Sequence, residues 1–135
     1  MRIFHLGWCG AWALVLATAT VTAAGDRPAE QFQTFCASWM DKLAVRERDN
    51  LRQIRWVASG DGVEGEYVGY SQEHTCELKS LSEPKATPVG KIKYQELRYQ
   101  KRGASASEAE AAAPRALEAT EVTEIFQYKK GKWVY

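Results

Sequence analysis

The feature that most constrains the fold is a pair of cysteines, Cys36 and Cys76, about 40 residues apart. Cys36 lies in a stretch with helical periodicity, and Cys76 lies in a stretch that alternates as a β-strand does. In an oxidising compartment, two cysteines have only one pairing available. A bond between them would tie a helix to a strand and would stabilise the fold by roughly 4 kcal/mol in the chain-entropy description.

The first 24 residues predict such a compartment, because they have the composition of a secretory signal. "MRIFHLGWCGAWALVLATATVTAA" begins with Arg2, continues with an apolar run and closes with small residues of an A-x-A-like cleavage site. The third cysteine, Cys9, would leave with this signal. A membrane anchor is the alternative, but Ala, Thr and Gly dilute the run below the about 20 strongly apolar residues of a spanning helix. We therefore expect a periplasmic or secreted protein with no membrane span after cleavage.

The remaining residues, 25–135, are enough for one domain around one modest core. The whole chain has 18 basic and 17 acidic residues, and the signal removes one arginine, so the mature charges balance. A neutral chain gives no reason to expect nucleic acid or an anionic membrane as a partner. The sequence contains no Gly-rich phosphate loop and no G-x-S-x-G, so we expect no cofactor.

A metal site is the alternative use of the two thiols, with His74 as the nearby third ligand. The thiols lack C-x-x-C spacing, so we expect a disulfide and no metal.

The first predicted element is a helix that Asp26 caps and in which Pro28 occupies the first turn. At about 100° per residue, an apolar stripe forms along one face. Its members are Phe32, Cys36, Trp39, Met40 and Leu43.

Two polar residues, Glu47 and Asn50, continue this apolar stripe. In one interpretation the helix ends near Asn50 and Glu47 lies over the rim of the core, where it reaches water. In the other, the helix continues to Ile54 and both side chains face a polar cavity. We favour the first interpretation, because Asn is an acceptable residue at a helix C-terminus.

The chain then predicts strands. Ser59-Gly60-Asp61-Gly62 is a strong turn signal. "EYVGYSQEHTCELK" alternates, and one parity should face the helix if Cys76 bonds Cys36. That parity contains Val68, Tyr70, Gln72, His74, Cys76 and Leu78.

"KIKYQELRYQK" is a further strand, in which Ile92 and Tyr94 share one parity while Leu97 and Tyr99 share the other. Either both faces of the sheet are partly covered, or a bulge near residues 95–96 shifts the register. Residues 103–119 are rich in Ala and Glu, and we expect a mobile surface loop or a frayed helix there. A hairpin with its turn at residues 129–132 closes the chain.

These elements define the fold class as α+β, with one N-terminal helix packed on a curved antiparallel β-meander. The order of the helix "AEQFQTFCASWMDKL", long strands and a closing "YKKGKW" hairpin resembles the cystatin-like roll, which includes the nuclear-transport-factor-two-like proteins. Inhibitory cystatins carry a Q-x-V-x-G hairpin, and the nearest stretch here, "GEYVGY", lacks it, so the resemblance implies a fold and not inhibition. The chain also resembles short exported bacterial proteins without an assigned activity.

Four residues are candidates for a binding site in a hollow between helix and sheet: Glu47, Tyr70, Gln72 and His74. We expect a small exported binding or interaction module without catalytic activity, whose partner is an unknown small molecule or envelope protein. The alternative is a small enzyme of the cone-shaped roll that uses Glu47 or His74 as acid or base. The enzyme requires both residues to converge in one deep pocket, whereas the binding module does not.

Overall fold

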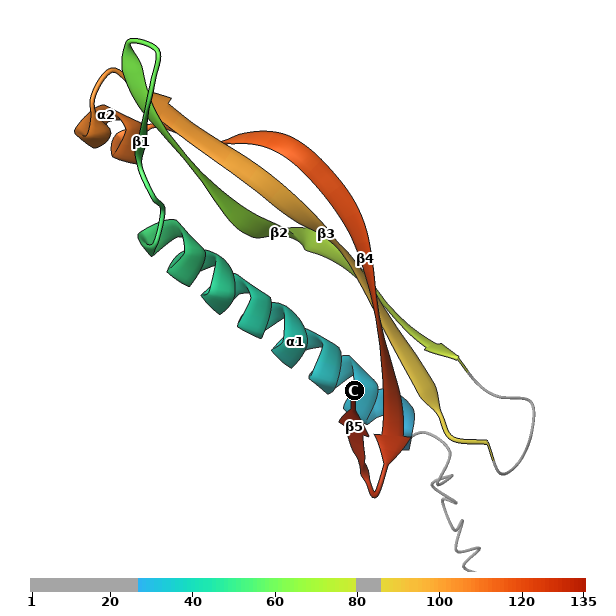
Figure 1. Cartoon of the computed structure of the whole chain (residues 1–135). Helices are drawn as coiled ribbons and strands as arrows, with labels where there is room; N and C mark the ends of the chain where they lie inside the picture. The colour runs from blue at the N-terminus through green and yellow to red at the C-terminus, as the bar shows by residue number, and fades with distance from the viewer. Residues whose placement is uncertain (1–26, 80–85) are drawn as a thin grey trace, which may run out of the picture.

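The computed structural model describes residues 27–79 and 86–135 (Figure 1). The signal segment and Asp26 lie outside these residues. The elements along the chain are α1 (Arg27–Arg52), β1 (Val57–Ser59), β2 (Gly62–Lys79), β3 (Val89–Gly103), α2 (Ala106–Ala111), β4 (Arg115–Lys129) and β5 (Lys132–Val134).

The five strands form one antiparallel sheet in the order β1-β2-β3-β4-β5, which is an open meander. One long helix packs against it, so the predicted α+β class is confirmed. Both predicted hairpins are present, because Ser59 pairs with Gly62 and Lys129 pairs with Lys132 across two-residue turns. In the second turn Lys130 and Gly131 both have positive φ, the conformation that suits a tight hairpin.

The predicted apolar stripe forms the face of α1 that contacts the sheet. Phe32, Cys36 and Leu43 are buried in the core. Trp39 and Met40 are partly buried and pack against the same cluster. Ile92, Tyr94, Phe126 and Trp133 complete this core from the strands and the closing hairpin. Within the described parts of the chain, no helix combines the length and apolar character that a membrane crossing requires.

The buried parity of β3 changes between its two halves, which settles the alternatives for this strand. Near α1, the buried residues of β3 are Gly90, Ile92 and Tyr94. In the other half, the parity reverses, and Lys101 is buried while its amine donates to the carbonyl of Glu110 in α2. β3 pairs with β4 without a shift through residues 95–96, but its pairing with β2 shifts there, between the partners Tyr70–Glu96 and His74–Tyr94. The predicted register shift is therefore present, with the extra residues on β2. α1 lies on the covered side of both halves, because a Cβ on Gly90 would meet Phe32 and a Cβ on Gly69 would meet Glu47.

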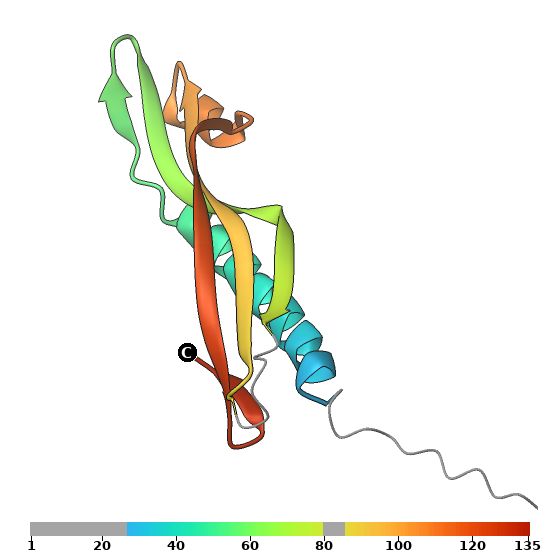
Figure 2. The same cartoon turned by 90° about the vertical axis from the view of Figure 1, so that its right-hand side faces the viewer.

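The same reversal occurs on β2, where it corrects the predicted inward parity. Gly65, Tyr67 and Gly69 are buried in the half near α2, so Val68 belongs to the opposite face. Between Tyr70 and His74 the pairing shifts, because β2 advances four residues while β3 advances two. Figure 2 shows β2 stepping sideways between its two halves. A simple alternation of residues does not reveal this insertion.

The segment 103–119 has more structure than predicted. Residues 106–111 form α2, with Ser105 as its N-cap and Ala109 fully buried. Residues 115–119 belong to β4, where Ala116 pairs with Tyr99. Residues 106–111 thus agree with the helix alternative, whereas the loop prediction is wrong for residues 115–119, because pairing with β3 supplies hydrogen bonds that the local composition does not indicate.

Candidate functional site

Glu47 and Asn50 lie where α1 passes the edge of β2, and both bind its backbone. A Glu47 carboxylate oxygen accepts a hydrogen bond from the Tyr70 N–H at 3.0 Å. The Asn50 amide donates to the Val68 carbonyl at 2.8 Å. Since Val68 and Tyr70 are two residues apart, their backbone groups lie on the same edge of the strand. The polar end of the helical stripe thus satisfies backbone groups that β1 does not reach, since β1 pairs only with residues 62–64 of β2.

This geometry agrees fully with neither predicted end of the helix. α1 ends at Arg52, between the two ends considered. Glu47 is half-buried, and one of its carboxylate oxygens accepts the Tyr70 N–H, a partner that the rim interpretation did not include. Neither Glu47 nor Asn50 lines the groove or the depression described below.

Two tyrosines that the sequence did not single out adjoin Glu47. Tyr67 and Tyr99 are directly paired across β2 and β3, and their rings stack with centroids 5.2 Å apart. Burial raises the pKa of the Tyr67 phenol above its usual value, and the nearby Glu47 and Tyr99 raise it further. The Tyr67 ring is therefore a neutral packing group beside the carboxylate.

Tyr70 and Gln72 line a groove of about 250 Å³ between α1 and the displaced part of β2. Met40 and Leu43 supply its apolar wall, and Asp41 supplies one acid. This groove is the part of the predicted hollow that the structure contains.

His74 does not share this groove. It is exposed and lines a separate depression of about 410 Å³, whose other walls include Lys93 and Glu121. The structure therefore distributes the four candidate residues over three environments: Glu47 at the strand edge, Tyr70 and Gln72 in the groove, and His74 in the depression.

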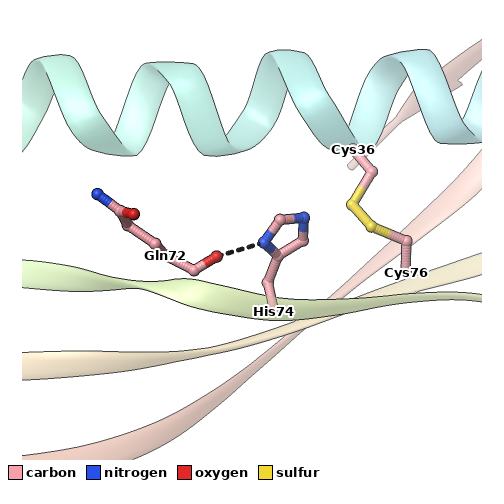
Figure 3. Close-up of a disulfide and its surroundings, with 4 residues drawn as sticks. All are labelled: Cys36, Gln72, His74 and Cys76. Atoms are coloured by element: carbon pink, nitrogen blue, oxygen red, sulfur yellow. Dashed lines mark hydrogen bonds between the residues drawn. A yellow bond between two sulfur atoms is a disulfide. The ribbon is translucent and has the colours of Figure 1, made fainter.

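The predicted disulfide is confirmed. Cys36 and Cys76 are bonded, with a Cα–Cα distance of 6.3 Å, and they connect α1 to β2 (Figure 3). Cys36 is fully buried, and Cys76 is half-buried. His74 lies beside the bond, because its ligating nitrogen and both sulfur atoms all fall within 4.8 Å of one another.

The His74 ring is oriented by its own strand. Its Nδ1 lies 2.7 Å from the Gln72 carbonyl oxygen. A carbonyl oxygen only accepts, so Nδ1 must carry the proton of this bond and donate it. In the neutral ring, Nε2 then keeps a free lone pair, and Figure 3 shows this second nitrogen on the side of the ring that faces the disulfide.

A second polar cluster, which the sequence did not predict, lies on β3, β4 and the C-terminal residue. Glu124 accepts hydrogen bonds from the phenols of Tyr94, at 3.1 Å, and Tyr135. Burial raises the pKa of Tyr94 to about 12, and the Glu124 carboxylate adds to the shift. Because Tyr94 and Glu124 come from neighbouring strands 30 residues apart, only the β3–β4 register brings them together.

The last candidate feature is the outer edge of β4. β4 pairs with β3 along one edge, whereas on the other edge only Gln127, Tyr128 and Lys129 pair, with β5. Among residues 27–79 and 86–135, no strand pairs with this edge from Arg115 to Phe126. A backbone edge of this length is a template for a further strand.

Comparison of the chain with protein-family models, with curated proteins and with solved structures gave no match.

Proposed function

We propose that this chain is an exported, non-catalytic interaction module that binds an extended segment of a partner protein along the free edge of β4. The observation that carries the proposal is the unpaired backbone of β4 from Arg115 to Phe126. Strand addition to such an edge is a general mode of peptide recognition, in which main-chain hydrogen bonds supply affinity and alternate side chains supply specificity.

The orientation of the free backbone groups follows from one hydrogen bond and the alternation of a strand. The Tyr128 N–H donates to the Pro88 carbonyl, on the β3 side. In an antiparallel strand, successive residues direct their backbone groups to alternate edges. The odd-numbered residues of this part of β4 therefore direct theirs away from β3. Thr123 and Ile125 belong to this set, and both side chains are exposed.

The chemistry of this edge selects the partner. Ile125 is 53% exposed on an otherwise polar face, so it offers an apolar contact to a partner side chain. Glu121 is exposed four residues earlier on the same face, and the structure gives it no salt bridge with a described residue. We therefore expect an extended segment with a basic residue opposite Glu121 and an apolar residue opposite Ile125.

The arrangement of the acid–base candidates supports binding over catalysis. An enzyme would need Glu47 and His74 in one pocket, and they lie in different environments. Glu47 already accepts the Tyr70 N–H, and His74 already bonds the Gln72 carbonyl. Each side chain thus has a local structural partner instead of a shared reacting atom.

Export and fold family complete the proposal. The disulfide supports an oxidising compartment, in keeping with the signal of residues 1–24. We expect the mature N-terminus within about two residues of Gly25. Mass spectrometry of protein from the producing cell tests this, and an intact Met1 in the envelope fraction would contradict it. The single helix on an open antiparallel meander supports membership of the cystatin-like roll.

The binding proposal is tested with a peptide library of about ten residues displayed against the mature, disulfide-bonded protein. Selected peptides should bind wild type and Thr123→Ala equally, because both keep the edge N–H. Thr123→Pro should weaken them at least about tenfold, because it removes that donor and leaves the pairing with β3 in place. Circular dichroism verifies that the variant folds.

Hydrogen exchange on the complex of wild-type protein and peptide tests the binding edge without any variant. Amides of Glu121, Thr123 and Ile125 should exchange more slowly when the peptide is bound. Ligands that leave these amides unprotected, or a library that yields no ligand, would refute the proposed use of the β4 edge.

A further inference from the structure

The cluster of Cys36, Cys76 and His74 has a second chemical state that the disulfide hides. We propose that reduction of the Cys36–Cys76 bond converts this cluster into a three-ligand site for Zn²⁺, made of two thiolates and His74 Nε2. This inference is independent of the β4 edge.

The distances support the site. In a tetrahedral zinc centre with Zn–S bonds of about 2.3 Å, two thiolates lie about 3.8 Å apart. Breaking the disulfide lets the two sulfur atoms separate to that distance by rotation of their side chains. The ligating atoms of all three residues already lie within 4.8 Å of one another, so His74 needs to move only on the order of 1 Å.

The state of His74 supports the site independently of distance. Ligand histidines almost always donate their other ring N–H to a carbonyl or carboxylate, which fixes the ring and its tautomer. His74 makes this bond already, from Nδ1 to the Gln72 carbonyl at 2.7 Å. The remaining nitrogen faces the sulfur atoms in Figure 3. The metal-competent orientation is therefore present before any metal binds.

The burial of the three residues indicates the side from which the metal ion would enter. Cys36 is fully buried, Cys76 is half-buried and His74 is exposed, so the ion would approach from the His74 side. With three protein ligands, the fourth zinc position stays open to water on that side, as it does in zinc sites that exchange ligands.

The chemical step is balanced with a small thiol as reductant. Two thiol molecules form one external disulfide, and their two electrons and two protons convert the Sγ–Sγ bond into two thiols. Zinc binding then releases both thiol protons, because only thiolates ligate the metal. Oxidation by an external disulfide reverses the sequence and expels the ion.

The test is titration of the mature protein with Zn²⁺ and with Co²⁺, before and after reduction by a phosphine that does not itself supply thiol ligands. We expect one equivalent bound only after reduction, with thiolate-to-Co²⁺ charge-transfer bands. His74→Ala keeps both cysteines and should weaken binding by more than about 100-fold, beyond the loss typical of a second-shell partner. Thr75→Ala, an exposed neighbour on β2, is the matched control and should bind as wild type does.

If reduction unfolds the chain, circular dichroism provides the readout, because it measures whether the metal restores the helix. In that case Zn²⁺ should restore the helical signal of wild type and not that of His74→Ala, since metal binding is coupled to folding. The inference is overturned if the reduced protein binds no stoichiometric Zn²⁺, if the ion restores no fold, or if His74→Ala binds as tightly as wild type.

Discussion

Glu47 provides the most direct test of how α1 is held against the sheet. Its carboxylate accepts the Tyr70 N–H at 3.0 Å from a half-buried position. Replacement by Leu removes the acceptor and leaves the N–H beside an apolar side chain. Replacement by Gln keeps an oxygen that can accept the same bond without the negative charge.

The size of the effect follows from this one bond. A hydrogen bond to a charged group contributes about 1.5–3 kcal/mol, and a buried donor left without a partner costs about 1–3 kcal/mol. These figures describe the same loss, so they do not add. Because Glu47 keeps contact with water, we expect Glu47→Leu to lower the free energy of unfolding by about 2 kcal/mol. Glu47→Gln should lower it by about 1 kcal/mol or less.

Urea denaturation at neutral pH, followed by tryptophan fluorescence, measures both variants beside wild type. Arg48→Leu is the control, because Arg48 is exposed on the same helix and should change stability by no more than about 0.5 kcal/mol. A Glu47→Leu variant within about 0.5 kcal/mol of wild type would refute the reasoning. It would mean that water replaces the carboxylate at no cost and that the strand edge does not need it.

Three further predictions concern the core. Gly90→Ala places a Cβ 2.1 Å from the Cε2 atom of the fully buried Phe32 ring, so we expect a loss of about 3 kcal/mol in urea denaturation; a loss below 1 kcal/mol would show that the ring moves freely. Tyr94 has its pKa raised to about 12, so the folded state holds the phenol proton more tightly than the unfolded chain. Its contribution is complete below pH about 10 and is lost between pH 10 and 12, and Tyr94→Phe should flatten the stability profile in that window; an unchanged profile would contradict the shift. Reduction of Cys36–Cys76 without metal should lower stability by about 4 kcal/mol, and an unchanged urea midpoint would show that the bond does not constrain the unfolded chain.

The features of the fold that the sequence predicts correctly depend on short-range patterns. The apolar stripe of α1 and the parity of Cys76 placed both cysteines between the same two layers, and the disulfide joins them there. The two hairpin turns could be predicted because each contains a glycine, and Gly60 and Gly131 adopt the positive φ that two-residue turns require.

The features that it misses depend on pairing between distant residues. Alternation along β2 assumes a regular strand, and the extra residues between Tyr70 and His74 are visible only against β3. Residues 115–119 contain one large apolar side chain, Leu117, so no periodicity marks them as strand. The partner of Glu47 is a backbone N–H, which every residue but proline possesses. The residue types in the sequence therefore do not indicate which residue binds Glu47.

The register shift that divides the sheet into two halves has a consequence for how the molecule opens. The half that contains the disulfide holds the large core, whereas the other half is closed by Ile54 and Trp56 against Gly65 and by α2 against Gly103. The buried side chains of the second half, Tyr67 and Ala109, lie outside the main core cluster, so melting of the second half should leave the first intact. The molecule should therefore unfold in native-state hydrogen exchange as two cooperative units of unequal stability, with the unit around α2 opening first while the cysteine-linked unit remains closed.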